Sequence, residues 1–134
     1  MGISYTCTCN SCQYEETFYI GAGMMDYSPN SALRTFSDVE REKVQEFIRS
    51  HQIYNCNVQR KLAEGIHNGK QCLALATTIK LETTDKQVRE FVSYSKELDE
   101  GSVKFHEENE LTKEKIACPN CAKDLNIQMT GYWD

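Results

Sequence analysis

The chain has 134 residues and a formal net charge of -5, and 26% of its residues are charged. This length fits one domain and excludes a multi-domain machine. The mildly acidic balance excludes a histone-like polycation and an acidic disordered tail. Leu, Ile, Val and Phe make up about one-fifth of the chain, the lower limit for a protein that folds on its core alone. We therefore expect a further source of stability, and seven cysteines are the obvious candidate.

We expect neither a secretory signal nor a transmembrane helix in this sequence. Its first five residues, Met1–Tyr5, lack a basic region and a long apolar region, so we expect no secretory signal. No apolar run approaches the ~20 residues that span a bilayer. We predict a cytoplasmic protein without membrane contact, where paired cysteines usually hold metal or do redox work.

The first predicted element is a strand, a tight turn and a second strand. Residues 4–20 are rich in Thr and aromatic side chains around a Cys-x-x-Cys turn, which favours this arrangement. Gly21-Ala22-Gly23 then ends the pattern.

Two helices are predicted next. Ser37 and Glu40 form a capping-box pattern, and the apolar residues that follow predict an amphipathic helix over 38–50. Val58, Leu62 and Ile66 recur every four residues, which predicts a second helix ended by Asn68-Gly69.

The second half of the chain contains apolar segments with predicted strand or helix structure and one highly charged segment. The run 72–79 is short and apolar and ends in β-branched residues, which favours a buried strand over a helix segment. A cap pattern followed by Val88, Phe91 and Val92 predicts a helix over 85–97. Residues 96–115 are highly charged and are typical of a solvated connection or edge hairpin, whereas 125–129 alternates like a half-buried strand.

Two Cys-x-x-Cys units bracket almost the whole chain. They are Cys9 to Cys12 and Cys118 to Cys121, with 105 residues between Cys12 and Cys118. A two-residue separation lets a tight turn aim both sulfurs at one ion about 2.3 Å away. Four thiolates complete a tetrahedral shell, which predicts a structural Zn²⁺ site, with iron as the second choice.

The remaining cysteines leave alternatives open. Cys7 could replace Cys9 as a ligand, but the spacing of Cys9 and Cys12 matches that of the second unit. Cys56 and Cys72 could contribute to another metal site, although isolated cysteines are commonly small buried hydrophobes. Each unit alone could also be a redox dithiol.

The segments Thr8–Glu15 and Tyr19–Met24, together with Cys118-Pro119-Asn120-Cys121, resemble small bacterial zinc-ribbon proteins built from two rubredoxin-type knuckles. In that group Gly commonly follows the second cysteine of a knuckle, whereas this chain has Gln13 and Ala122. The resemblance implies a zinc ribbon with a large insertion, and it adds little about function because many such proteins have no established activity.

Other candidate chemistry is sparse. Gly21-Ala22-Gly23 lacks the third glycine of a dinucleotide-binding loop, and His51, His67 and His106 lack metalloprotease spacing. Arg49, Arg60, Lys61 and Lys70 could form a basic patch if the first two helices lie side by side. However, four thiolates and one Zn²⁺ take the formal charge from -5 to about -7, which disfavours nucleic-acid binding.

We therefore expect one α+β domain over 1–134. A terminal zinc β-ribbon is predicted from 4–23 and 114–133, with a mainly helical region inserted at about 35–100. The predicted function is that of a non-catalytic intracellular module that binds another protein, as an adaptor or small inhibitor. A nucleic-acid-binding accessory protein and an enzyme with an unrecognised site are the alternatives. We expect the partner surface on charges of the first two helices and of 96–115, including Arg41, Arg49, Arg60 and Lys61.

Overall fold

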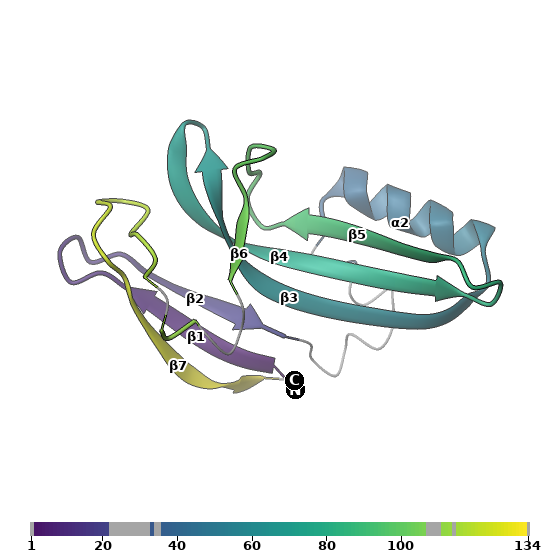
Figure 1. Ribbon diagram of the computed structural model, residues 1–134, viewed down its shortest axis with the longest axis horizontal. Coiled ribbons are helices and arrows are strands. Elements are labelled where there is room, and N and C mark those ends of the chain that lie inside the picture. Colours follow the sequence, from purple (N-terminus) through teal and green to yellow (C-terminus); the bar gives the residue numbers. More distant parts are fainter. Residues whose placement is uncertain (1, 22–32, 34–35, 107–110, 114, 134) are drawn as a thin grey trace.

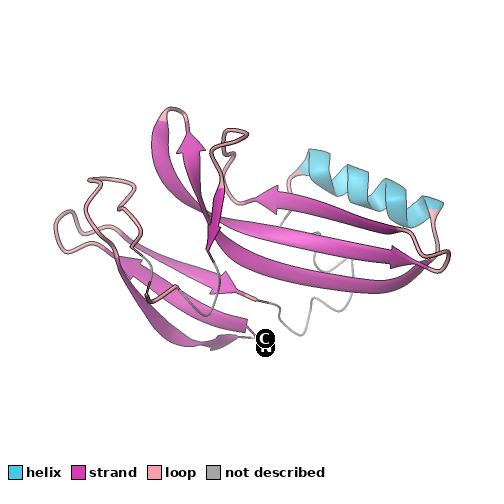
Figure 2. Cartoon of the chain, in the orientation of Figure 1, coloured by secondary structure: helices cyan, strands magenta, loops and turns pink. Residues whose placement is uncertain are grey.

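The structure is a computed structural model that describes residues 2–21, 33, 36–106, 111–113 and 115–133. Within these ranges strands predominate and one helix packs beside them (Figures 1 and 2). The elements in chain order are β1 Gly2–Thr8, β2 Glu15–Ile20, α2 Asp38–Ser50, β3 Ile53–His67, β4 Lys70–Thr83, β5 Val88–Tyr94, β6 Lys104–His106 and β7 Asn126–Trp133.

The strands form two antiparallel sheets. One sheet has the order β2-β1-β7, so the first strand of the chain lies between the second and the last. Gly2 pairs with Trp133 and Thr8 pairs with Asn126, which brings the two ends of the chain together (Figure 1). The other sheet has the order β5-β4-β3-β6 and is built on the long β3–β4 hairpin. The predicted strands around residues 4–20, 72–79 and 125–129 are confirmed.

The predicted second helix is wrong, because residues 53–67 form strand β3. Val58, Leu62 and Ile66 are four residues apart, and four is also a multiple of the two-residue period of a strand. Asn68 and Gly69 do not end a helix; with φ of 51° and 78° they form the tight turn between β3 and β4.

The predicted helix over 85–97 is also wrong, since Val88–Tyr94 is strand β5. Phe91 is buried against the helix, whereas Val88 is exposed on the opposite side of the strand. The inserted region is therefore mainly a sheet with one short helix, and the fold is α+β with a predominance of strand. The helix lies between the two cysteine pairs in the sequence, as expected.

Helix α2 is confirmed with the predicted bounds. It begins after Ser37, whose hydroxyl accepts a hydrogen bond from the N–H of Glu40 at 3.4 Å, and it ends before His51. Its buried residues Val44 and Phe47 pack on Val58 and on other apolar residues of β4 and β5. The helix thus covers one end of one face of the four-stranded sheet.

The three-stranded sheet covers the other end of that face. Leu62 and Leu73 of the long hairpin pack into a core with Phe18, Ile20 and Ile127 of the small sheet. Because side chains alternate across a strand, this face is apolar and the opposite face carries a different set of residues.

Among the described residues, no helix has both the length and the apolar content that a membrane span requires.

Arg60 joins the two halves of this face. Its side chain is 3% exposed and its guanidinium carbon lies 5.3 Å from the ring centre of Trp133. Its backbone exchanges two hydrogen bonds with Gly21, at 2.8 and 3.0 Å. The prediction that Arg60 belongs to an exposed basic patch is wrong, because β3 points this side chain inward between the sheets.

Candidate metal centre

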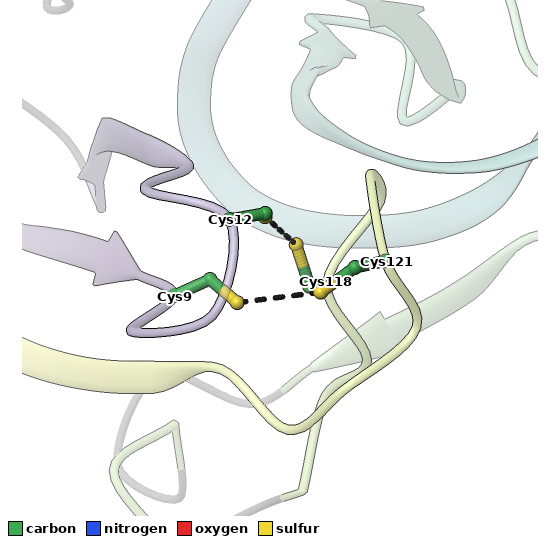
Figure 3. Close-up of side chains that lie close together, drawn as sticks. All are labelled: Cys9, Cys12, Cys118 and Cys121. Atoms are coloured by element: carbon green, nitrogen blue, oxygen red, sulfur yellow. Dashed lines mark hydrogen bonds between the residues drawn. The ribbon is translucent and has the colours of Figure 1, made fainter.

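The two Cys-x-x-Cys units lie side by side at one end of the molecule. Cys9 and Cys12 belong to the turn between β1 and β2, and Cys118 and Cys121 belong to a turn that precedes β7. β1 and β7 are neighbours in the small sheet, and their pairing places the two turns together. The four Sγ atoms lie within 4.8 Å of one another (Figure 3). The predicted proximity of these four cysteines is confirmed.

The two turns, which we call knuckle 1 (residues 9–13) and knuckle 2 (residues 118–122), have the same backbone hydrogen bonds. The N–H four residues after the first cysteine donates to that cysteine's carbonyl, at 2.9 Å in both knuckles. The first cysteine's N–H donates to the carbonyl five residues ahead, at 2.9 Å for Cys9 and 2.7 Å for Cys118. These bonds close each knuckle and direct both sulfurs to one side.

The last residue of each knuckle has a left-handed backbone. Gln13 has a φ of 63° and Ala122 a φ of 66°. These are the positions at which the resembling proteins commonly have Gly, which adopts this conformation without a Cβ clash. The knuckle geometry is therefore kept in this chain by residues that are strained at these positions.

Backbone N–H groups point at the sulfurs and favour their ionised form. Those of Cys12 and Ser11 lower the pKa of the Cys9 thiol to about 6. The N–H of Tyr14 lowers the pKa of Cys12, but burial and the neighbouring sulfurs outweigh it and raise that pKa to about 12. The N–H of Asn120 lies 3.4 Å from Cys118 Sγ. The site thus favours ionisation of one thiol and opposes ionisation of further thiols beside it. A bound cation is therefore needed if all four cysteines are to be thiolates.

The sulfur geometry suits a tetrahedral ion. Cys9 Sγ lies 3.4 Å from Cys121 Sγ, and Cys12 Sγ lies 3.4 Å from Cys118 Sγ. A tetrahedral zinc site with bonds of about 2.3 Å separates its sulfurs by about 3.8 Å. Movements of a few tenths of an ångström would fit the group to the ion, so these four cysteines could hold a metal.

Cys7 does not join the four-sulfur group. It lies on β1 with 0% exposure, in register with Glu16 and Ile127 of the neighbouring strands. Burial, and then the carboxylate of Glu16, raise the pKa of this thiol to about 11. Cys72 is also buried, and burial raises its pKa, whereas Cys56 is partly buried against the core beneath α2. These three cysteines occupy packing positions.

The three histidines lie apart from the sulfurs. His51 ends α2, where its ring stacks on Phe47 with centroids 4.2 Å apart. His67 ends β3 and contacts the carbonyl of Glu97. His106 is 1% exposed, and its Nε2 lies 2.8 Å from a carboxylate oxygen of Glu64. In the part of the chain that the structure describes, the four cysteines are the one group placed to hold a metal.

Sequence reasoning missed a cleft beside knuckle 2. It has a volume of about 530 Å³ and lies between that knuckle and Lys70 and Gln71, at the start of β4. The Asn68-Gly69 pair is typical of a hairpin turn, so the sequence could have predicted the turn between β3 and β4. Nothing in the sequence indicates that this turn lies beside Cys118 and Cys121.

A second unpredicted feature is the face of the four-stranded sheet opposite α2. Its residues alternate with the buried ones along β3, β4 and β5, and it carries a groove of about 410 Å³. The groove, which we call the open-face groove, is lined by Asn57, Gln59, Lys61, Thr78, Lys80, Glu90, Val92 and Phe105.

Comparison of the chain with protein-family models, curated proteins and solved structures finds no match.

Proposed function

We propose that this protein is a non-catalytic protein-interaction module whose two ends are clamped by a structural zinc ion. Cys9, Cys12, Cys118 and Cys121 would be the ligands. The observation that supports this proposal most directly is the convergence of four sulfurs from opposite ends of the chain.

The donor set favours zinc and a structural role. Four thiolates saturate a tetrahedral Zn²⁺ ion and leave no position for substrate, unlike the three-ligand sites of catalytic zinc. Iron suits the same shell and is the second choice. Such a site can contribute about 10 kcal/mol or more to folding, which would supplement a small apolar core. The ligands must be thiolates, so we place the protein in a reducing compartment such as the cytoplasm.

The open-face groove is the surface that we assign to the partner. Phe105 is 46% exposed at one end, where its ring stacks with that of Tyr94 at a centroid distance of 6.4 Å. Farther along, Lys80 of β4 pairs in register with Glu90 of β5. Charges of both signs beside an aromatic ring complement a polypeptide of mixed charge better than a polyanion. The partner would place an apolar residue on Phe105 and an acidic one near Lys80.

This assignment moves the partner surface away from the helices on which the sequence places it. The second helix is a strand, and Arg60 is buried. Arg41 donates to the carbonyls of Leu33 and Phe36, at 3.1 and 3.0 Å, and so fixes the chain before α2.

Metal analysis tests the clamp. Native mass spectrometry of the chain purified without a metal-binding tag should show one zinc per chain, and Cys118→Ser should abolish tight binding because three ligands remain. Cys7→Ala is the matched control: it should keep the zinc and lose only packing, about 1 kcal/mol of stability. A metal-free protein that is fully folded would refute the site.

Photo-crosslinking tests the partner surface. A photoreactive residue at Gln59, in the groove, should capture a protein in the native host, and the same residue at Val39, exposed on α2, is the control. The captured protein, once purified, should bind the zinc-loaded chain, and Phe105→Asp should weaken that binding without changing zinc content. Capture only from Val39, or binding unaffected by Phe105→Asp, would remove the groove from the proposal.

The nucleic-acid alternative has one observation in its favour, because Lys61, Lys80 and Phe105 share the groove. Fluorescence anisotropy with single-stranded DNA and RNA discriminates the two functions. We expect no binding at physiological salt, whereas micromolar affinity that falls steeply with added salt would favour the alternative, since such a slope counts phosphate contacts.

A further inference from the structure

We propose that the four-sulfur centre is oxidised by peroxide to two disulfides that form between the knuckles, Cys9 with Cys121 and Cys12 with Cys118. The inference rests on the zinc site of the proposed function and goes beyond it. It assigns the centre a second, metal-free state and states how its four sulfurs pair.

The pairing follows from two sulfur–sulfur contacts that cross between the knuckles. Each of the two cross-knuckle pairs is separated by 3.4 Å (Figure 3). A disulfide bond is about 2.05 Å long, so each pair must close by somewhat more than 1 Å. The two pairs share no sulfur, and both bonds can form in one molecule.

The four sulfurs allow two other pairings, and one of them joins the two cysteines within each knuckle. A bond from Cys9 to Cys12 would draw together the two ends of a turn that the hydrogen bond from Gln13 N–H to the Cys9 carbonyl already closes. The corresponding bond from Ala122 N–H to the Cys118 carbonyl holds knuckle 2 in the same way. Cross-knuckle bonds need only a small approach of two intact turns.

Exposure divides each pair into an outer and an inner sulfur. Cys12 and Cys121 are partly buried, whereas Cys9 and Cys118 are only 3% and 1% exposed. The cleft of about 530 Å³ is lined by both Cys118 and Cys121, and it gives a small oxidant a path to knuckle 2, where Cys121 is the more exposed of the two cysteines. Each cross-knuckle pair joins one outer sulfur, which a peroxide can reach, to one inner sulfur 3.4 Å away, which can complete the bond.

The chemistry balances with two molecules of peroxide. The thiolate of Cys121 attacks one peroxide oxygen, the O–O bond breaks, and Cys121 becomes a sulfenic acid while hydroxide leaves. The Cys9 thiolate then attacks that sulfur and displaces a second hydroxide, so that the two sulfurs together lose two electrons. The same two steps join Cys12 to Cys118. In total four thiolates and two peroxides take up four protons and yield two disulfides, four waters and free Zn²⁺.

The consequence is that oxidation removes the ion without separating the ends of the chain. Both cross-knuckle disulfides join residues 9–12 to residues 118–121, which are the segments that the metal joins. Disulfides within each knuckle would release the ion and leave no covalent bond between knuckle 1 and knuckle 2.

Peptide mapping distinguishes the two pairings directly. Zinc-loaded protein is treated with two equivalents of hydrogen peroxide, free thiols are alkylated, and the product is digested with trypsin. The cleavage sites Arg34, Lys115 and Lys123 place Cys9 and Cys12 in peptide 1–34 and Cys118 and Cys121 in peptide 116–123. We expect these peptides to be covalently linked, with fragment spectra that assign the two bonds, and Cys7, Cys56 and Cys72 to be alkylated. Unlinked peptides that each carry an internal disulfide, or linked peptides that join Cys9 to Cys118 and Cys12 to Cys121, would overturn the proposal.

A chromophoric chelator measures zinc release in the same reaction. One equivalent of zinc should appear as the linked peptides form, and Cys7→Ala should leave both the rate and the linkage unchanged. Zinc content measured before peroxide separates the two hypotheses. A chain without zinc contradicts the proposed function, whereas a zinc-loaded chain that resists peroxide or pairs within its knuckles contradicts this inference alone.

A sulfenic-acid trap tests the order of attack. Added together with the peroxide and quenched early, dimedone should label Cys12 and Cys121 before it labels Cys9 or Cys118. First labelling of Cys9 or Cys118 would refute the assignment of outer and inner sulfurs.

Discussion

Gln13 and Ala122 adopt a backbone conformation that their side chains disfavour. With φ of 63° and 66° they complete the two knuckles, and each carries a Cβ where Gly would have none. The left-handed conformation costs an L-residue about 1–2 kcal/mol. This conformational strain lies at the residues that complete the two knuckles. Substitution at these positions is therefore the most direct way to raise the stability of the protein.

We predict that Gln13→Gly and Ala122→Gly each raise the stability of the zinc-loaded protein. The gain should be about 0.5–1 kcal/mol, because relief of the left-handed strain exceeds the extra entropy of Gly in the unfolded chain. Lys123→Gly, beside Ala122 but without a positive φ, is the control and should lower stability. Denaturant unfolding in excess zinc measures all three, and loss of stability in both knuckle variants would contradict the prediction.

At this scale the sequence predicts the candidate site well. The matched spacing of Cys9–Cys12 and Cys118–Cys121 reports a local requirement of the metal, which holds whatever lies between the two units. The burial of Arg60 could not be predicted, because it depends on how two sheets pack and a long charged side chain is usually exposed.

The hairpin turns determine how the long strands pair. Between β3 and β4, Asn68 and Gly69 have φ of 51° and 78°, as a two-residue turn between twisted strands requires. A Cβ at Gly69 would meet nothing within 4 Å, so only the backbone conformation resists substitution there.

We predict that Gly69→Ala lowers stability by about 1 kcal/mol, since alanine disfavours a positive φ. Gly69→Asn should lose less, because asparagine tolerates the left-handed region. Thermal unfolding of the zinc-loaded variants compares them. Equal losses from Ala and Asn would show that the loss comes from something other than the backbone conformation.

The turn between β4 and β5 contains a carboxylate with a shifted pKa. The Thr83 hydroxyl donates to Asp85 and, as the main cause, lowers the pKa of this carboxyl below its ordinary value of 3.8. The amide of Gln87 donates to its other oxygen at 3.1 Å. Because the folded pKa is the lower one, the stabilising contribution is complete above the unfolded value near 3.8 and is lost as the pH falls through the folded pKa.

We predict that Thr83→Val moves the pKa of Asp85 upward, toward its ordinary value. Valine has the shape of threonine without the hydroxyl, so the variant removes the hydrogen bond to Asp85 and the one that the hydroxyl accepts from Gln87 N–H at 3.0 Å. Carboxyl-carbon NMR titration of Asp85 in both proteins provides the measurement. An unchanged pKa would mean that Thr83 does not hold the charge.

The elements show where sequence patterns become ambiguous. A spacing of four residues in Val58, Leu62 and Ile66 satisfies one face of a helix and one face of a strand equally. The helix over 38–50 was predictable because its cap and its apolar spacing both indicate a helix. In β3 the Asn68-Gly69 pair was the discriminating signal, because it favours a hairpin more strongly than a helix end.

At the scale of the whole molecule, the candidate metal site and the two sheets depend on contacts between distant parts of the chain. The small sheet contains strands from both ends of the chain, and strands within residues 53–106 build a separate sheet between them. Pairing of β1 with β7 is the contact that brings the knuckles together, and no local pattern could reveal it. A zinc ion would add to this pairing a bond that crosses 105 residues of sequence.

Because Gly2 and Trp133 are paired neighbours, the position of the chain ends can be changed by circular permutation. A short Gly/Ser linker from residue 134 to residue 1, with new ends cut between Asn68 and Gly69, would leave Cys121 and Cys9 separated only by residues 122–134, the linker and 1–8. The loop that the metal closes would then be short, which lowers its entropic cost by about 1 kcal/mol. We predict a permutant that keeps one zinc per chain and refolds faster in its presence, measured by stopped-flow fluorescence of Trp133. A permutant that binds no zinc would show that the chain order itself, and not the pairing of β1 with β7, assembles the centre.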